Sequence, residues 1–492
     1  MKRPLQHIKT CLLTGMLVAG MTGCNSWLDL NPENKQTSAT YWNKKEDVEA
    51  VVMSGYTRLR GCLQQIIEWG ELRGDGLALD AKASTDEQKI VELDILSDNG
   101  ICKWDKFYKV IGSANSILKY GPEVLQKDPT FAEALLNSYI AECVFLRSLS
   151  YFYLLRTFGE VPLVLEPYVD DEISFKQGKS SERVIIDQLI ADLKSVIKTA
   201  KPGFETEWEN KGRASRWAVY ALLADIYLWD EQYQNCIDAC DELFKTEMVG
   251  FIEDPEEWFD IFLEGNTDEG IFELQYNTTQ TNDLYKWFET EPRFKLSEAS
   301  NLLFQEVPGV NDNRGAGASY VTSDYHIWKY IGAGIGEAAG KTERKGNNWI
   351  FYRYSEIMLM KAEALAMLGG PENYQASVDL VNIIRRRAGY TTDLRAANNE
   401  YDALMMVIDE RQREFIAEGK RWFDILRVAK RNNYAQKNYL IDKLLASVSA
   451  ANRPIYESKL QDPNSYYLPI HENEIKNNTG ILVQNPYYLT NN

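Results

Sequence analysis

The sequence predicts a mostly α-helical protein in which tetratricopeptide-like helix pairs form a scaffold that carries a loop-rich insert with short strands. Three observations support this fold class. Apolar residues recur at spacings of three and four through both ends of the chain, two segments share one helix-turn-helix pattern, and residues 247–348 break the helical periodicity. With 492 residues, of which 45% are hydrophobic, the chain can bury a substantial core.

Residues 1–23 have the pattern of an export signal. Three basic residues, Lys2, Arg3 and Lys9, precede a mostly apolar run that is too short to span a bilayer. The run ends in "MTGC", which resembles a lipobox, so Cys24 is the expected lipidation site. Acylation there would anchor the protein without a transmembrane helix. The alternative is an ordinary signal peptide followed by an incidental cysteine.

Charge and composition exclude several classes of function. The net charge is −18, and removal of residues 1–23 makes it more negative because that segment holds no acidic residue. Nucleic acid and anionic lipid surfaces would repel such a chain. The histidines left after processing, His326 and His471, lie in no ligand-spaced cluster, so we expect no zinc site, no histidine-dependent triad and no cofactor. The remaining cysteines are odd in number and cannot all pair: Cys62, Cys102, Cys143, Cys236 and Cys240.

The first half of the mature chain contains four predicted helices. The longest apolar stretch holds Glu142 and Arg147, which indicates a buried helix and not a membrane span. A serine cap followed by acidic residues opens the fourth helix. The predicted helices lie in residues 42–61, 104–121, 131–159 and 180–200. Glycines stand where left-handed caps are expected, at Gly61, Gly121 and Gly159.

Two later segments predict paired helices. Residues 221–243 and 359–381 each run from an alanine-rich apolar helix through a turn into "YQ", followed three residues later by "ID" or "VD". Small residues allow a partner backbone to approach, which is typical of tetratricopeptide-type repeats. The alternative is a coincidence between two amphipathic hairpins. Both interpretations give an α-helical scaffold.

Residues 24–492 are expected to form one domain, with helical scaffold at about 38–246 and 349–492. The insert at about 247–348 is rich in Gly, Asn, Thr, Asp and aromatic residues, which favours loops and short strands. A long loop region on a rigid scaffold often carries function. It could instead be a passive lid over the core.

The stretch "ERQREFIAEGKRWFDILRVAK", residues 410–430, raises the question of an active site. On one continuous helix, Ile408, Phe415, Trp422 and Leu426 would share an apolar face. The surrounding charges are spaced for local i,i+3 and i,i+4 pairs: Glu410, Arg411, Glu414, Glu418, Arg421, Asp424 and Arg427. A glycosidase would need two carboxylates facing across roughly 5–10 Å of cleft. The predicted role is therefore structural.

Several motifs together resemble the SusD-like (RagB/SusD) outer-membrane lipoproteins of Bacteroidetes. The resembling segments follow the family's order along the mature chain. They are "CNSWLDLNPEN" from Cys24, "FLRSLSYFYLLRTFGEVPLV" from Phe145, "NDNR" from Asn311, "RYSEIMLMKAEAL" from Arg353, "VNIIRRRAGY" from Val381, residues 410–430, and "YLPIHENEIKNNTGILVQNPYY" from Tyr467.

This resemblance implies a function that composition alone does not. It implies a SusD-like fold and a lipid-anchored protein on the outer face of the outer membrane. Such a protein binds a glycan, has no enzymatic activity and delivers the glycan to a SusC-like TonB-dependent transporter. Two alternatives remain: a peptide-capturing relative within the family, and a lipid-anchored glycoside hydrolase. A calcium ion in the Asn/Asp-rich loops is also considered, although "NDNRG" lacks the acidic spacing of a calcium loop.

The resemblance implies that early and central loops hold the ligand, without identifying the residues. Both regions combine aromatic side chains that we expect to be exposed with hydrogen-bonding residues in non-helical context. Sugars need rings for stacking and polar groups for their hydroxyls. Trp104 is set aside because it opens a predicted helix, where we expect it to be packed. The candidate ligand residues are Trp69, Arg73, Asp75, Tyr285, Trp287, Tyr325 and Trp328.

Overall fold

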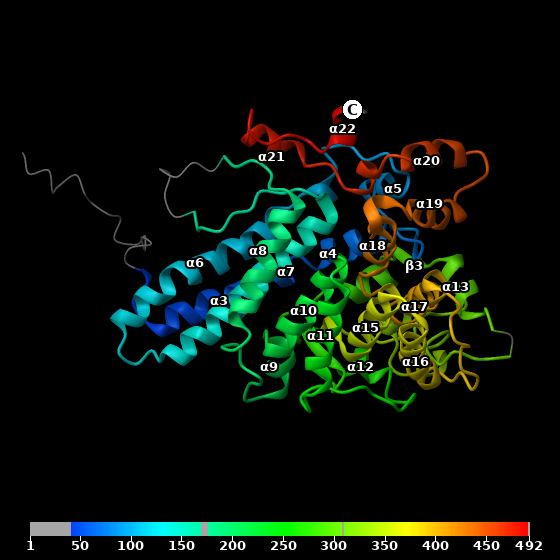
Figure 1. Ribbon diagram of the computed structural model, residues 1–492, viewed down its shortest axis with the longest axis horizontal. Helices are drawn as coiled ribbons and strands as arrows, with labels where there is room; N and C mark the ends of the chain where they lie inside the picture. Colours follow the sequence, from blue (N-terminus) through cyan, green and yellow to red (C-terminus); the bar gives the residue numbers. More distant parts are fainter. Residues whose placement is uncertain (1–40, 169–175, 308, 491–492) are drawn as a thin grey trace, which may run out of the picture. The chain divides into compact units, whose positions relative to one another are not determined.

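The computed structural model describes residues 41–168, 176–307 and 309–490 (Figure 1). The chain divides into two units, residues 1–43 and 44–492, and every element described below belongs to the second. The predicted export segment and Cys24 lie outside the described residues. Elements keep the labels of Figure 1.

The N-terminal half of the second unit is helical, as predicted. One short strand, β1 (Leu77–Leu79), interrupts it. Its helices are α3 (Lys45–Arg60), α4 (Leu63–Glu71), α5 (Thr85–Val91), the 3₁₀ turn η2 (Gly100–Cys102), α6 (Asp105–Lys127), α7 (Glu133–Phe158), α8 (Glu182–Val196), α9 (Glu207–Gly212), α10 (Arg216–Trp229) and α11 (Tyr233–Phe244).

The C-terminal part is helical again after strand β4 (Trp349–Arg353). Its helices are α15 (Tyr354–Leu368), α16 (Pro371–Arg387), α17 (Glu400–Glu414), α18 (Arg421–Tyr434), α19 (Lys437–Ala446), α20 (Arg453–Leu460), the 3₁₀ turn η5 (Pro463–Tyr466), α21 (Glu472–Asn477) and α22 (Pro486–Thr490). The mostly α fold class is confirmed.

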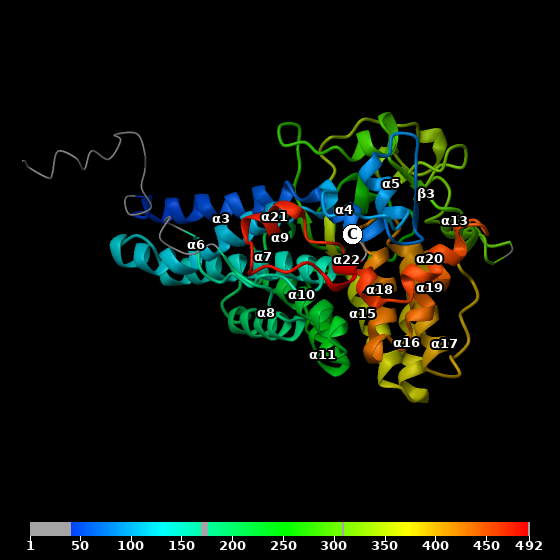
Figure 2. The same ribbon diagram turned by 90° about the horizontal axis from the view of Figure 1, so that it is seen from above.

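The two predicted helix pairs are present and belong to one stack. Helix α10 packs on α11, α11 packs on α15, and α15 packs on α16. Figures 1 and 2 show these pairs following α3, α6 and α7 along the horizontal axis that both views share. A fully buried apolar cluster joins α15, α16 and the end of α17: Met358, Leu359, Ala362, Val381, Ile384, Val407 and Phe415. The scaffold is therefore a continuous array of tetratricopeptide-like pairs.

The central segment consists of loops and short elements, as its composition predicts. Its elements are α12 (Asp260–Leu263), β2 (Gly270–Leu274), the π-helical turn η3 (Lys286–Thr290), β3 (Phe294–Leu296), α13 (Glu298–Phe304), α14 (Trp328–Ile331) and the 3₁₀ turn η4 (Glu337–Ala339). Two antiparallel strand pairs tie it to the scaffold. Strand β2 pairs with β4, and β3 pairs with β1, in register Leu77 to Leu296.

The predicted helix boundaries are partly wrong. Gly159 follows α7 with a φ of +73°, as expected for a cap, and the Ser181 hydroxyl accepts the Val184 amide at the start of α8. Gly121, however, lies inside α6, which continues to Lys127. A Cβ on Gly121 would lie 2.7 Å from the Leu136 side chain, so this glycine provides space for α7 and does not end a helix. Gly61 has helical dihedrals, with a φ of −65°.

Helix α7 is long and mostly apolar, but it is a buried helix of the protein interior and not a membrane span. Glu142 accepts hydrogen bonds from Tyr56 at 2.7 Å and from Arg213 at 2.7 Å, which satisfies a charge that a lipid environment would leave costly. In the part of the chain that the structure describes, no helix is both long and apolar enough to cross a membrane. The five cysteines of that part are unpaired and buried.

Candidate functional site

The segment 410–430 is not one helix, which corrects the sequence interpretation. Helix α17 ends at Glu414 and α18 begins at Arg421, with left-handed residues at Ala417 (φ 61°) and Gly419 (φ 72°) between them. This turn packs on α4, where the Glu71 side-chain oxygen Oε1 accepts the Gly419 amide at 2.7 Å. Most of the predicted local charge pairs consequently do not form.

The charges of this segment instead pair with distant, equally buried partners. Arg353 is fully buried and contacts Glu269 at 2.8 Å, Glu418 at 3.0 Å and Glu414. Arg314 lies 2.7 Å from Glu410. Further pairs of this buried network join Arg314 to Asp312 and Glu414, Lys329 to Glu418, Arg387 to Glu269 and Glu414, Arg427 to Glu363, and Arg411 to Asp424. One predicted local pair does form, between Asp424 and Arg427.

The electrostatics of this network support a structural role. Burial opposes ionisation of Glu414, but the guanidinium groups of Arg387, Arg353 and Arg314 outweigh it and hold the pKa of Glu414 well below its usual range. Burial also opposes ionisation of Asp424, but the guanidinium groups of Arg411 and Arg427 outweigh it and lower the pKa of Asp424 to about 2. A general acid needs a raised pKa. These carboxylates therefore serve as buried structural anions.

The early candidate residues are buried, so the expectation that they are exposed is wrong. Trp69 on α4 is 1% exposed, donates its indole N–H to the Ile101 carbonyl at 2.9 Å and stacks on Phe107. The Arg73 guanidinium lies over the Trp422 ring, 4.2 Å from its centroid. Asp75 pairs with Arg421. The Gly419 turn and the start of α18 cover this stretch, a long-range packing that local sequence pattern does not report.

The two central tryptophans are also packed. Trp287 lies in η3 and is 8% exposed, with the Arg293 guanidinium 5.6 Å from its ring centroid. Trp328 opens α14, is 1% exposed and donates its indole N–H to the Gly334 carbonyl at 2.8 Å. The expectation of exposed tryptophans is wrong because each ring packs against other residues of the insert: Trp287 against Arg293, and Trp328 against the loop at Gly334.

Two candidate residues remain at the surface. Tyr325 is 38% exposed and its ring stacks against that of buried Tyr320, with centroids 6.1 Å apart and an angle of 22°. Its backbone has a φ of 63°, a conformation that costs a bulky L-residue about 1 kcal/mol or more. Tyr285 is half-buried at the start of η3. A strained backbone such as that of Tyr325 is found preferentially at binding sites.

Polar groups from the early and central loops meet beside these rings. His326 Nδ1 lies 2.8 Å from Glu289 Oε2, and Nε2 lies 3.2 Å from Asp80 Oδ2. Lys341 Nζ lies 2.8 Å from Glu289 Oε1. Backbone hydrogen bonds from Asp80 to Arg293 and from Leu296 to Tyr325 fix the two loops side by side. We call this surface the loop face: Asp80, Tyr285, Glu289, Tyr325, His326 and Lys341.

The loop face lies mostly in the central loops that the sequence indicated, but its polar residues were not among the candidates. His326, Asp80, Glu289 and Lys341 lie far apart in the sequence and belong to no motif. The available signal was "SDYHIW", where His326 follows an aromatic residue in a polar loop. Among the residues that the structure describes, no group of three or more His, Cys, Asp or Glu side chains is arranged to hold a metal ion.

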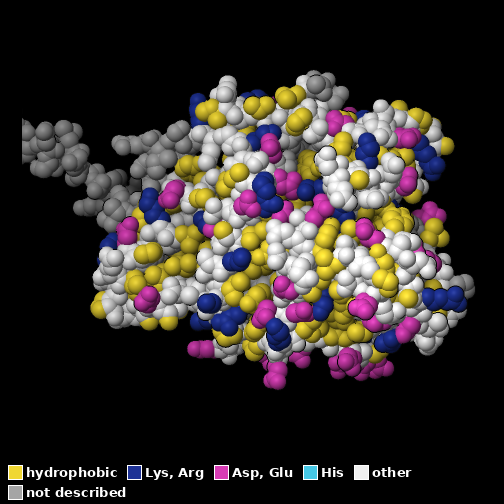
Figure 3. Space-filling view, in the orientation of Figure 1, with side chains coloured by type: hydrophobic (Ala, Val, Ile, Leu, Met, Phe, Trp, Pro, Cys, Tyr) yellow, Lys and Arg dark blue, Asp and Glu magenta, His cyan; other side chains and the backbone are white. Residues whose placement is uncertain are grey.

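Acidic and basic side chains are intermixed at the surface, as they are in the buried network of residues 410–430. Figure 3 shows acidic and basic side chains interspersed over the described part of the face that it presents. The helical array and the loop face define a class of protein: a binding scaffold built from helix pairs, with its candidate ligand residues on loops.

Comparison with known proteins identifies the family. The profile of the SusD family matches residues 227–488, and a second profile, described as starch-binding associating with outer membrane, matches residues 26–228. The chain belongs to the SusD family. The SusD-like protein P38 of Formosa agariphila is 22% identical over 87% of this chain and 92% of its own length.

Solved structures share the fold. A SusD superfamily protein from Bacteroides vulgatus aligns with a TM-score of 0.74 and 21% identity, covering 91% of this chain and all of its own. Surface glycan-binding protein A from Bacteroides uniformis aligns with a TM-score of 0.72 and 22% identity, covering 90% and 100%. The predicted SusD-like fold is thereby confirmed.

Proposed function

We propose that this protein captures an oligosaccharide or polysaccharide at the cell surface and delivers it to a SusC-like TonB-dependent transporter in the outer membrane. The observation that carries the ligand class is Tyr325, a surface ring held in a strained conformation beside polar side chains. Sugars present CH faces that stack on such rings and hydroxyls that need hydrogen-bond partners. Membership of the SusD family supports this choice.

The polar groups of the loop face suit a hydroxylated ligand. Asp80 contacts His326, Lys295 and the Ala81 amide, and Glu289 contacts His326 and Lys341. A carboxylate has about four lone-pair sites, so each retains acceptor capacity. The seven candidate residues from the sequence fall into a surface set and a buried set. Tyr285 and Tyr325 are proposed to contact ligand directly, whereas the buried candidates support the surrounding structure: Trp69, Arg73, Asp75, Trp287 and Trp328.

The proposed role is binding without catalysis. The buried carboxylates of the 410–430 segment are neutralised by arginine and lysine, so they offer no general acid. Incubation with the bound polysaccharide should release no new reducing ends. A steady release of reducing ends would instead favour the hydrolase alternative.

The proposed location is the outer face of the outer membrane, held by lipid on Cys24. The profile that matches residues 26–228 is described as associating with outer membrane, which supports this location. Stable obligate partners bury more than about 2,000 Å². Mild detergent extraction should therefore co-purify a SusC-like protein, and repeated recovery of this chain alone would count against that partner.

The ligand class is tested by parallel glycan and peptide arrays. Purified protein that lacks residues 1–24 should bind a subset of glycans and no peptide. Binding to peptides alone would replace the proposed function with peptide capture on the same scaffold.

A further inference from the structure

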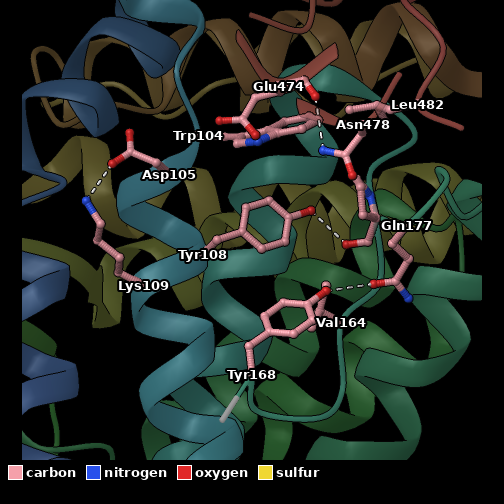
Figure 4. Close-up of a pocket in the computed structure, with 11 residues that line it drawn as sticks. Trp104, Asp105, Tyr108, Lys109, Val164, Tyr168, Gln177, Glu474, Asn478 and Leu482 are labelled. Atoms are coloured by element: carbon pink, nitrogen blue, oxygen red, sulfur yellow. Dashed lines mark hydrogen bonds and ion pairs between the residues drawn. The ribbon is translucent and has the colours of Figure 1, made fainter. Parts of the chain in front are cut away.

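A cavity of about 290 Å³ opens between α6, the segment 161–168 and α21. This volume lies just below the range of about 300–1,000 Å³ that small-ligand pockets occupy, and is enough for a single sugar unit but not for a long chain. Figure 4 shows the rings of Trp104, Tyr108 and Tyr168 on one side of it, and the amides of Gln177 and Asn478 on the other. We call it the α6–α21 groove: Trp104, Tyr108, Tyr168, Gln177, Glu474 and Asn478.

The aromatic side of the groove combines packed and exposed rings. Trp104 is 3% exposed and meets Phe158 edge to face, with centroids 5.3 Å apart, so it is packed as the sequence predicts. Tyr108 is half-buried and Tyr168 is 43% exposed. The groove therefore presents apolar ring surface, which a sugar can cover with its CH groups.

The walls of the groove are held in place before any ligand binds. The Tyr108 hydroxyl donates to the Pro162 carbonyl at 2.7 Å. The Val164 carbonyl accepts from Asn115 Nδ2 at 3.0 Å, and the Val164 amide donates to the Tyr151 hydroxyl at 2.7 Å. Because these bonds tie the segment 161–168 to α6 and α7, a ligand would lose little free energy in ordering the site.

Hydrogen-bonding groups line the opposite side. Gln177 donates through Nε2 to the Leu163 carbonyl at 3.1 Å, and its Oε1 accepts the Tyr168 hydroxyl at 3.4 Å. Asn478 donates to the Glu474 carbonyl at 3.0 Å. Each amide thus has a donor in use, and its orientation is defined. An amide has two donors and an acceptor oxygen, so both side chains retain capacity for a hydroxyl group.

The charges of the groove disfavour an anionic ligand. Its cation, Lys109, is paired with Asp105 at 2.7 Å. The Glu474 carboxylate is half-buried on α21 and has no ion pair among the described residues. A sulfate or uronate group would meet this negative charge without a free cation nearby, which costs binding free energy.

We propose that the α6–α21 groove is a second carbohydrate subsite, which binds a hexopyranose unit of a neutral glycan. It shares no residue with the loop face. Helix α21 and strand β3 also lie at different positions along the horizontal axis that Figures 1 and 2 share. Two subsites on one scaffold would raise the avidity for a long chain that can reach both. The ligand class in this inference rests on the proposed function.

Disaccharide binding tests the groove directly. Maltose, cellobiose, laminaribiose and mannobiose are offered at millimolar concentration to the full chain without its export signal, and binding is followed by saturation-transfer NMR. At least one should bind. Tyr168→Ala should weaken that binding about 5-fold or more, because a stacking ring is lost. Tyr168→Phe should retain most of it, and Tyr401→Ala, which removes an exposed tyrosine on α17, should change nothing.

Charge selectivity provides an independent readout. The wild type should bind digalacturonic acid more weakly than the preferred neutral disaccharide, and Glu474→Gln should narrow that difference. Thermal unfolding of each variant confirms that the fold is retained, since both altered side chains are at least partly exposed. The inference is overturned if none of the four neutral disaccharides binds, or if binding is the same in Tyr168→Ala as in the wild type.

The loop face serves as the control that separates this inference from the proposed function. Tyr325→Gly should leave disaccharide binding in the groove unchanged. If long glycans bind through Tyr325 while Tyr168→Ala has no effect on any ligand, the proposed function stands and the groove inference fails. If disaccharides bind through Tyr168 while Tyr325→Gly leaves long-glycan binding intact, the groove inference stands and the loop face is wrong.

Discussion

Arg421 and Asp75 form a buried bidentate ion pair between the start of α18 and the residues that follow α4. Nε of Arg421 lies 2.5 Å from Oδ1 of Asp75, and Nη2 lies 3.1 Å from Oδ2. Both side chains are no more than 5% exposed. The pair joins positions 346 residues apart, so Asp75 contributes to the closure of the fold and not to a ligand surface.

Loss of the Asp75 charge should destabilise the protein. Asp75→Asn leaves the Arg421 guanidinium buried without its counter-ion, and removal of one partner of a buried pair typically costs about 3–5 kcal/mol. Urea unfolding of the wild type and the variant measures the difference. Asp393→Asn, which breaks an exposed pair with Arg386, is the control and should leave the midpoint unchanged. An Asp75→Asn variant with wild-type stability and weaker glycan binding would contradict this interpretation.

The close approach of Gly70 to the Gly419 turn gives a second prediction. A Cβ on Gly70 would lie 1.9 Å from the Gly419 carbonyl oxygen, and both groups are backbone. Gly70→Ala should therefore cost about 1–3 kcal/mol or more. Gly112→Ala is the matched control, because nothing lies within 4 Å of a Cβ there and α6 should gain about 0.5–1 kcal/mol. Thermal melts that rank the two variants in the opposite order would refute the packing.

Glu71 should make stability depend on pH. Burial raises its pKa to about 8, although the amides of Gly419 and Lys420 oppose the shift. The folded state then binds more protons than the unfolded state between about pH 4.5 and 8, so this residue's contribution to stability falls as pH rises through that window. The stability of Glu71→Gln relative to that of the wild type should therefore rise as the pH is raised from 5 to 8.

Chemical unfolding at several pH values measures this difference. The expected relative gain of Glu71→Gln is at least about 1 kcal/mol at pH 8 compared with pH 5. Glu457→Gln, at an exposed position on α20, should show no such trend. Parallel stability curves for the wild type and Glu71→Gln would show that the folded protein does not hold a proton on this carboxyl.

Anchoring gives a fourth prediction. Cys24→Ala should release the protein into soluble fractions while its melting temperature stays the same, because the proposed anchor is lipid and not a protein segment. Fractionation after labelling with palmitate measures both membrane association and lipid incorporation. Continued incorporation of label by the variant would exclude Cys24 as the acylated residue.

The helical part of the fold could be predicted because its signals are local. Apolar spacing and small residues specify the pairs α10–α11 and α15–α16, and each pair is recognisable within about 25 residues of sequence. The break after Glu414 could not be predicted in this way. It depends on the contact of the Gly419 turn with Glu71, which lies 348 positions away.

Long-range contacts limit the prediction of the candidate site even more than that of the helices. Trp69 and Trp328 occur in polar, glycine-rich stretches that resemble exposed loops, yet each ring is buried and its indole N–H donates to a backbone carbonyl. Their burial follows from long-range packing, which hydrophobic periodicity does not report. Conversely, His326 joins the loop face through Asp80 and Glu289, which only strand pairing brings together. The local pattern thus indicated the central loops that hold the rings of the loop face, but most of the candidate residues are buried.

Calorimetric titration of Tyr325→Gly with the glycan selected on the array tests the central claim most directly. Glycine relieves the left-handed backbone at this position and removes the exposed ring, so the melting temperature should stay near that of the wild type. The free energy of binding should become less favourable by about 1–3 kcal/mol, as for other rings that stack on a ligand. Tyr401→Ala should change neither quantity. Wild-type affinity in Tyr325→Gly would contradict glycan capture at the loop face.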